Sequence, residues 1–279
     1  MYYDEESISG LKDETSLPEH LRKGWKATDM SSLIYTSGST GLPKAVILKR
    51  GRELMVGQSM SRYLRLKPSD RYYSCMPLYH GAAHALLVTT SIHAGSIVVL
   101  GRKFSHHRFW PEVRASKANI IQYVGELCRY LVNAPPSPLD KEHNVEMAFG
   151  NGLRPDIWEK FRERFGIPVI NEVYAATDGI GASFNENKGD FTKFAIGKRG
   201  LIYRMLRASV EVLVKIDPDT EDILRDENGF AIKCKIGEPG EVIHQINPQK
   251  RNAAFHGYFK NKAAGDKRMI KDVFRKGDL

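Results

Sequence analysis

Over most of the chain, short apolar runs alternate with segments whose apolar residues recur at helical spacing. The apolar runs predict strands at residues 32–36, 45–50, 71–79, 96–100, 119–125, 145–149 and 168–174. The segments with helical spacing predict helices at residues 51–66, 85–95, 105–116, 126–134 and 154–166. Strands and helices that alternate in this way are typical of βαβ units. We therefore predict an α/β fold, a mainly parallel sheet with flanking helices, in which the strand at 96–100 is buried.

The pattern changes near Arg207. Beyond it, short runs of alternating apolar and polar residues are separated by Asp, Pro, Asn and Gly, which favours antiparallel hairpins or a small barrel. The first 28 residues carry few apolar positions and little periodicity. The sequence thus predicts a lead-in segment at 1–28, an α/β part of a large domain at 29–206, and an antiparallel β subdomain at 207–279.

The acidic segment at residues 217–228 is loosely similar to a calcium-binding loop. Its sixth position is Asp222, where such a loop needs glycine, and its twelfth is Asn228, where it needs glutamate. We predict a hairpin turn at this segment.

Composition limits the choice of partners. Of 279 residues, 42% are hydrophobic and 27% are charged, which is ordinary for a globular protein. The net charge of +9 favours anionic partners such as nucleotides, CoA-like phosphates or an acidic membrane surface. No nucleic acid partner is expected, because the basic residues are scattered and no basic–aromatic motif is present.

Cysteine usage and the N-terminus bear on the compartment. Cys75, Cys128 and Cys234 lie far apart, which indicates a reducing, intracellular environment. The N-terminal residues are acidic and polar, unlike a signal peptide. No stretch approaches the roughly 18 apolar residues of a membrane span, so we expect no transmembrane segment in this chain.

The strand at 32–36 runs into a loop rich in Gly, Ser and Thr that ends at Lys44. Glycines let backbone N–H groups approach phosphate oxygens, hydroxyls donate further hydrogen bonds, and Lys44 adds a positive charge. The loop is not a Walker A motif, since Gly41 and Lys44 are not adjacent and Pro43 precedes the lysine. The residues alone leave two interpretations, a polyphosphate-binding loop and a polar surface hairpin.

The full string YTSGSTGLPKAV, residues 35–46, resembles the phosphate-loop signature of the adenylate-forming superfamily, the AMP-dependent synthetases and ligases. Later segments resemble further motifs of that superfamily in the expected order: MPLYHGAAH at 76–84, GNGLRPDIW at 150–158, VYAATDG at 173–179 and GEPGEV at 237–242. Stretches at 121–136, 147–168 and 271–278 resemble the branch of very-long-chain acyl-CoA synthetases and fatty-acid transport proteins. The resemblance implies a partial large domain of an acyl-CoA synthetase-like fold.

This resemblance implies ATP-dependent activation of a long- or very-long-chain fatty acid. The acid and ATP form acyl-AMP, and CoA as co-substrate then gives acyl-CoA. The expected cofactors are ATP and Mg²⁺. Full-length members associate with membranes of the endoplasmic reticulum, peroxisome, lipid droplet or cell surface, which implies peripheral membrane contact and allows a homo-oligomer.

The resemblance also assigns residues. Lys44, Thr177 and His80 are the expected catalytic residues, and Asp178 is the expected Mg²⁺ ligand although the superfamily usually carries glutamate there. Tyr174 is expected against adenine, with Ala175 where glycine is usual. The complete set expected at the nucleotide is Thr36, Ser37, Gly38, Ser39, Thr40, Gly41, Lys44, Gly150, Asn151, Gly152, Tyr174, Ala175 and Thr177.

His80 and His84 share a spacing of four residues, which on a helix could bind zinc. No H-E-x-x-H glutamate or third ligand accompanies them. We predict instead that His80 is a gate at the acyl pocket and that His84 is ordinary packing or surface. The apolar stretch at 122–131 is predicted as core, with a lining of the acyl tunnel as the alternative.

The C-terminal residues FRKGDL resemble the superfamily's ribose-binding segment. Asp278 is either the ribose ligand or a residue just before it. On either interpretation we expect the hinge and the small C-terminal domain, with its catalytic lysine, to be absent from this chain. The chain is then catalytically incomplete, or alternatively a non-catalytic relative that binds nucleotide or acyl chains or regulates a full-length partner.

Overall fold

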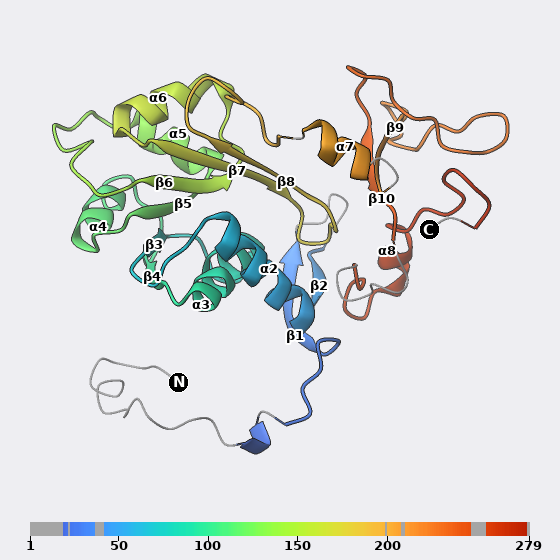
Figure 1. Cartoon of the computed structure of the whole chain (residues 1–279), viewed down its shortest axis with the longest axis horizontal. Coiled ribbons are helices and arrows are strands. Elements are labelled where there is room, and N and C mark those ends of the chain that lie inside the picture. The colour runs from blue at the N-terminus through green and yellow to red at the C-terminus, as the bar shows by residue number, and fades with distance from the viewer. Residues whose placement is uncertain are drawn as a thin grey trace.

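The computed structural model describes residues 19–21, 23–36, 42–198, 200–207, 210–246 and 255–277. Most of these residues form a central sheet with helices on both faces (Figure 1). The remainder form a smaller antiparallel part near the C-terminus, and a short 3-10 helix, η1 (Glu19–Leu21), lies near the N-terminus. Helices on both faces of a mainly parallel sheet define the α/β class, as predicted.

The central sheet has six strands in the order β4, β3, β5, β6, β7, β8. They are β3 (Arg71–Ser74), β4 (Ile97–Leu100), β5 (Ile120–Val124), β6 (Met147–Asn151), β7 (Val169–Ala175) and β8 (Ala182–Asn187). The first five pair in parallel, and β8 runs antiparallel to β7. The mainly parallel sheet is confirmed. Strand β8 escapes sequence analysis because its residues, ASFNEN, are mostly polar.

The prediction that residues 96–100 form a buried strand is wrong. Strand β4 lies at the edge of the sheet, beside β3 alone. Ile97 is 41% exposed and Leu100 is 51% exposed. An apolar run looks the same in an edge strand and in a central strand, so its position in the sheet is decided by the tertiary structure.

Alternation along the strands divides the core between the two faces of the sheet. Tyr73 belongs to the cluster beneath α4 (Phe109–Ala115), α5 (Gly125–Asn133) and α6 (Pro155–Phe165). The next residue back, Tyr72, enters the opposite cluster beneath α2 (Arg50–Tyr63) and the π-helix η2 (Ala82–Thr89). Successive strand residues point to opposite faces, so both faces of this sheet need apolar cover.

The helix boundaries follow local signals. Helix α6 begins at Pro155, whose fixed φ suits a first helical position, and ends before Gly166 in the left-handed conformation. The predicted helix at 85–95 is observed as η2 followed by α3 (Thr90–Ala94), which ends before Gly95 at φ 70°. These termini are where the sequence predicted them.

A separate hairpin joins the two parts of the molecule. Strand β1 (Met30–Thr36) pairs antiparallel with β2 (Lys44–Lys49). Residues 257–259 lie along the other edge of β2, where the backbone N–H of Phe259 donates to Ala45 O at 2.8 Å. Figure 1 shows the hairpin between the central sheet and the C-terminal part.

The C-terminal part is antiparallel, in agreement with the pattern beyond Arg207. Strand β9 (Glu211–Val214) pairs with β10 (Glu241–His244), helix α7 (Leu201–Arg207) precedes them and α8 (Lys262–Asp266) follows. The side chain of Asp217 accepts hydrogen bonds from two backbone N–H groups of its own turn, at 2.9 and 3.0 Å. The acidic segment is therefore a turn, as predicted.

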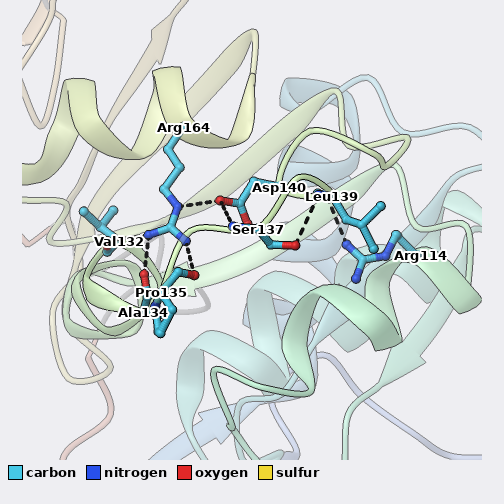
Figure 2. A network of polar contacts seen from close by, with 8 residues as sticks. All are labelled: Arg114, Val132, Ala134, Pro135, Ser137, Leu139, Asp140 and Arg164. Atoms are coloured by element: carbon cyan, nitrogen blue, oxygen red, sulfur yellow. Dashed lines mark hydrogen bonds and ion pairs between the residues drawn. The ribbon is translucent and has the colours of Figure 1, made fainter.

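The connection from α5 to β6 is held by one arginine of α6 (Figure 2). Arg164 donates to the backbone oxygens of Val132 at 2.6 Å, Ala134 at 2.7 Å and Pro135 at 2.8 Å, and to Asp140 Oδ2 at 2.8 Å. These partners, one at the end of α5 and three in the loop that follows, fix that connection against the end of α6.

Within the described ranges, no helix is both long and apolar enough to cross a membrane.

Candidate functional site

The carboxyl ends of the parallel strands bring the sequence motifs to one edge of the sheet. The segment after β3 contains His80 and Gly81, β6 ends in the turn Gly150–Gly152, and β7 is followed by Thr177. A Cβ built on Gly81 would lie 2.8 Å from Thr177 Oγ1, so these two loops are in contact. This edge is where open α/β sheets bind their ligands.

The turn after β6 is fixed by a buried carboxylate that sequence analysis did not single out. Glu172 of β7 is fully buried and accepts hydrogen bonds from the N–H groups of Gly152 at 3.0 Å and Leu153 at 2.9 Å. It also accepts one from the hydroxyl of Tyr123 at 2.6 Å. Burial raises the pKa of Glu172, against the effect of these hydrogen bonds. The buried carboxylate of Glu172 therefore fixes the backbone of the turn after β6.

Close approach explains the glycines of this turn. A Cβ on Gly125 would lie 1.7 Å from Gly152 O, and a Cβ on Gly150 would lie 2.1 Å from Tyr123 O. Gly152 itself has φ +77°, which L side chains rarely adopt. Glycine at these three positions therefore allows the turn after β6 to pack closely against Tyr123 and the start of α5.

Tyr174 and Ala175 end β7, and both are exposed. Tyr174 is 60% exposed, so its ring is available to stack on a ligand. Thr177 is partly buried in the following loop. Asn151 is exposed at the end of β6. The structure thus brings the residues expected near adenine and the α-phosphate to the same edge.

The hydroxyl-rich loop is only partly described. Thr36 ends β1, and its Oγ1 donates to Lys44 O at 3.4 Å. Ser37, Gly38, Ser39, Thr40 and Gly41 lie outside the described residues, as does Asp278. The ammonium of Lys44 lies 5.5 Å from the centroid of the Tyr258 ring.

Asp178 lies among cationic and hydroxyl groups. Its Oδ2 accepts a hydrogen bond from Tyr258 Oη at 2.6 Å and lies 3.4 Å from a guanidinium nitrogen of Arg268. Arg52 donates to the backbone oxygen of the next residue, Gly179, at 2.7 Å. Burial lowers the pKa of Arg52, and the nearby Asp178 opposes that effect. Among the described residues, Arg52 Nη1 is buried and has no hydrogen-bond partner.

His84 is partly buried and belongs to a polar cluster, a more specific contact than the ordinary packing or surface that the sequence predicts. His84 Nε2 lies 2.7 Å from Glu53 Oε1, which also accepts from Ser32 Oγ at 2.8 Å, and Ser31 bonds the other oxygen of Glu53. Burial acts to raise the pKa of Glu53, but the hydrogen bonds from His84 and the two serines outweigh it and lower the pKa to about 2. The hydrogen bond to Glu53 raises the pKa of His84, against burial.

This cluster ties three elements together, because the serines lie on β1, Glu53 on α2 and His84 on η2. The spacing of the two histidines gave no sign of Glu53. His80 lies outside the cluster, exposed, with its Nδ1 accepting from Ala82 N at 3.2 Å. In the part of the chain that the structure describes, no group of three or more His, Cys, Asp and Glu residues is arranged to hold a metal ion.

Residues 122–131 are mostly core. Tyr123, Leu127, Cys128 and Leu131 are buried in the cluster beneath α4–α6, whereas Tyr130 is 60% exposed. A cavity of about 860 Å³ lies outside this stretch, between residues 178–180, the strands β9 and β10, and residues 267–275. It opens beside Asp178.

The chain belongs to the family of AMP-binding enzymes, whose model matches residues 2–245. Among curated relatives it is 55% identical over 278 residues to the very long-chain fatty acid transport protein of Cochliobolus heterostrophus, covering 100% of this chain and 43% of the relative. It is 40% identical over 256 residues to the medium/long-chain-fatty-acid–CoA ligase FadD6 of Mycobacterium tuberculosis, covering 91% of this chain and 40% of the relative. The chain therefore spans less than half the length of these relatives.

Solved structures support the fold. ATP-bound MatB from Rhodopseudomonas palustris matches with a TM-score of 0.68 and 19% identity, over 98% of this chain and 48% of that one. O-succinylbenzoate coenzyme A synthetase from Bacillus subtilis, in complex with ATP and magnesium ion, matches with a TM-score of 0.64 and 20% identity, over 88% of this chain and 46% of that one. At these identities the likeness shows a shared fold.

Proposed function

We propose that the whole protein activates long- or very-long-chain fatty acids. The acid and ATP form acyl-AMP and pyrophosphate, and the thiol of CoA then displaces AMP to give acyl-CoA. The proposal agrees with the fatty-acid names of the relatives. The observation that carries it is that three motifs far apart in the sequence come together: the turn Gly150–Gly152, Tyr174 and Thr177 lie at one edge, and Asp178 is connected to Lys44 through Tyr258.

In this proposal the nucleotide lies along that edge. The backbone of Gly150–Gly152 and the ring of Tyr174, with Ala175 beside it, bind adenine. Thr177 donates to the α-phosphate. Lys44, with Thr36 and the loop residues 37–41, holds the β- and γ-phosphates.

Asp178 is the proposed Mg²⁺ ligand. Its described contacts both involve Oδ2, so Oδ1 is available, and Mg²⁺ is commonly held by one or two carboxylates together with substrate phosphates. The residues therefore fit the ion. When bound, Mg²⁺ supplies positive charge to the phosphates.

The chemistry needs charge stabilisation, because a carboxylate approaches a polyphosphate and both are anions. Lys44 supplies one positive charge, and Arg52 and Arg268 near Asp178 supply two more. The buried Nη1 of Arg52, which lacks a partner among the described residues, is suited to donate to an anion. No covalent nucleophile is required of the chain. His80, exposed beside the Thr177 loop, is the proposed gate for the acyl chain.

The test is fatty-acid-dependent exchange between ATP and pyrophosphate, with circular dichroism to confirm that the chain is folded. We expect Lys44→Ala to weaken ATP binding, and His80→Ala to alter acyl-chain preference with less effect on ATP. If both variants bind ATP like the parent, the site assignment is wrong.

The same assay addresses the alternative, a non-catalytic chain that binds nucleotide or acyl chains. A folded chain that binds ATP and shows no exchange would leave the family assignment standing and make this chain catalytically incomplete. Exchange that requires a long-chain acid would refute the non-catalytic alternative.

We also propose peripheral membrane contact through α7. Leu201, Ile202, Met205 and Leu206 are between 71% and 75% exposed on this short helix. Nearby, Lys198 lies 4.2 Å from the centroid of an exposed phenylalanine ring. Exposed apolar side chains with a lysine close by in the sequence suit the boundary of an anionic bilayer. The division of the chain between residues 206 and 207, which falls at the last residue of this helix, also remains a proposal.

A further inference from the structure

We propose that Tyr258 is a positioning residue that holds the carboxylate of Asp178 beside Lys44. The inference rests on the proposed function, since it concerns the metal and phosphate end of the nucleotide. Tyr258 comes from a segment that lies 80 residues beyond Asp178 in the sequence. Sequence analysis did not single it out.

The position of Tyr258 is fixed by the backbone and by packing. It forms a bridge with Val46 on the free edge of β2, and the flanking residues Gly257 and Phe259 hydrogen bond to the backbone of β2. Its side chain is 6% exposed and belongs to the small core formed with Ile34, Val46 and Leu48. A ring held in this way cannot turn its hydroxyl elsewhere without breaking the core.

The hydroxyl of Tyr258 is the donor in a short hydrogen bond to Asp178 Oδ2, at 2.6 Å. A carboxylate with one oxygen held by a donor presents its other oxygen in a fixed direction. Hydrogen bonds of this kind to a metal-binding carboxylate typically orient it, and their loss typically weakens metal affinity 10- to 100-fold.

The same tyrosine also contacts Lys44. Lys44 Nζ lies 5.5 Å from the ring centroid, within the range of a cation–π contact. Asp178 contacts the hydroxyl of the same ring. One side chain therefore contacts both the proposed metal ligand and the lysine proposed to hold the phosphates.

The experiment compares Tyr258→Phe with Tyr63→Phe in the whole 279-residue chain. The control Tyr63→Phe also removes a tyrosine hydroxyl that donates a hydrogen bond, in this case to Asn171 Oδ1 at 3.2 Å. This hydroxyl does not contact Lys44 or Asp178. ATP affinity is measured by calorimetry in excess Mg²⁺ and again in EDTA. We expect Tyr258→Phe to weaken Mg²⁺-dependent ATP affinity about 10-fold, with little change in EDTA, and we expect Tyr63→Phe to match the parent in both.

A structural role alone would lower ATP affinity equally in Mg²⁺ and in EDTA, which would overturn the proposal. Tyr258→Phe in an Asp178→Asn background should add no further loss; an additional 10-fold loss there would also contradict it. Thermal unfolding checks the fold. Tyr258→Trp, which keeps a ring against the core but lacks the phenol, should reproduce the selective loss, and a normal Mg²⁺ dependence in that variant would refute the role.

A parent chain that binds no nucleotide under either condition would refute the proposed function, and the role of Tyr258 with it. A parent that binds Mg²⁺–ATP beside a Tyr258→Phe variant of unchanged Mg²⁺ dependence would refute the role of Tyr258 alone.

Discussion

Replacing Arg164 by alanine should destabilise the protein severely. Its guanidinium is bonded to three backbone oxygens and to Asp140, and the two charged side chains are 18% and 14% exposed. Removing one partner of a buried ion pair costs about 3–5 kcal/mol, because the other charge is left without compensation. Three backbone oxygens also lose their donor.

The contributions of the four hydrogen bonds do not add, because they share one guanidinium. We therefore expect the loss in the free energy of unfolding to lie within about 3–5 kcal/mol and not to reach the sum of four separate contributions. Urea denaturation followed by circular dichroism measures it by linear extrapolation. Arg164→Lys keeps the positive charge, but an ammonium lacks the planar set of N–H donors that reaches all four partners. Its loss in the free energy of unfolding should therefore be intermediate.

Arg65→Ala is the matched control. Arg65 also pairs with a carboxylate, Glu186 at 2.8 Å, but its side chain is 67% exposed. Exposed pairs contribute about 0–1 kcal/mol. If Arg164→Ala and Arg65→Ala lower the free energy of unfolding by the same amount, burial does not determine the contribution of the Arg164 network drawn in Figure 2.

Three further outcomes are expected. Glu172→Gln should weaken ATP binding about 10-fold, because the turn loses a charged acceptor for two N–H groups and each such hydrogen bond contributes about 1.5–3 kcal/mol. Calorimetry compares the variant with the parent, and equal ATP affinity in the two would contradict this expectation. Folding lowers the pKa of Glu53 from 4.5 to about 2 and raises that of His84 above 6.5. The stabilisation by their pair is therefore lost as the pH falls from 4.5 towards 2, and it declines again above 6.5. Glu53→Gln should flatten this pH dependence of the free energy of unfolding, measured by urea titrations at several pH values, and an unchanged profile would refute the pairing. Leu206→Glu should lower flotation with anionic vesicles, whereas Ile92→Glu, at an equally exposed position on α3, should not; equal behaviour of the two variants would exclude α7 as the contact.

Much of the fold could be predicted from the sequence, because the signals involved are local. Apolar runs and helical spacing identified five of the six strands of the central sheet and its main helices, and Gly95 and Gly166 marked helix ends. The twelve-residue string at 35–46 and the later motifs carried the family. These features depend on a residue and its near neighbours in the chain.

The tertiary structure decided what depends on distant partners. The turn at Gly152 looks like a self-contained motif, yet it is held by Glu172 of the next strand and by Tyr123 of the previous one. A single polar residue inside an apolar strand gives no periodic signal, so its partners could not be read from the pattern. The same holds for Glu53, whose connection to His84 spans 31 residues.

The sequence by itself determined the class of fold, the order of the motifs and the residue types available for binding a nucleotide. Only the tertiary structure decided that β4 lies at an edge and that Lys44 and Asp178 meet through Tyr258. The physical reason is the range of the interactions. Periodicity and turn chemistry act over a few residues, whereas the position of a strand in a sheet and the partner of a buried polar group are set by packing between segments far apart in the chain.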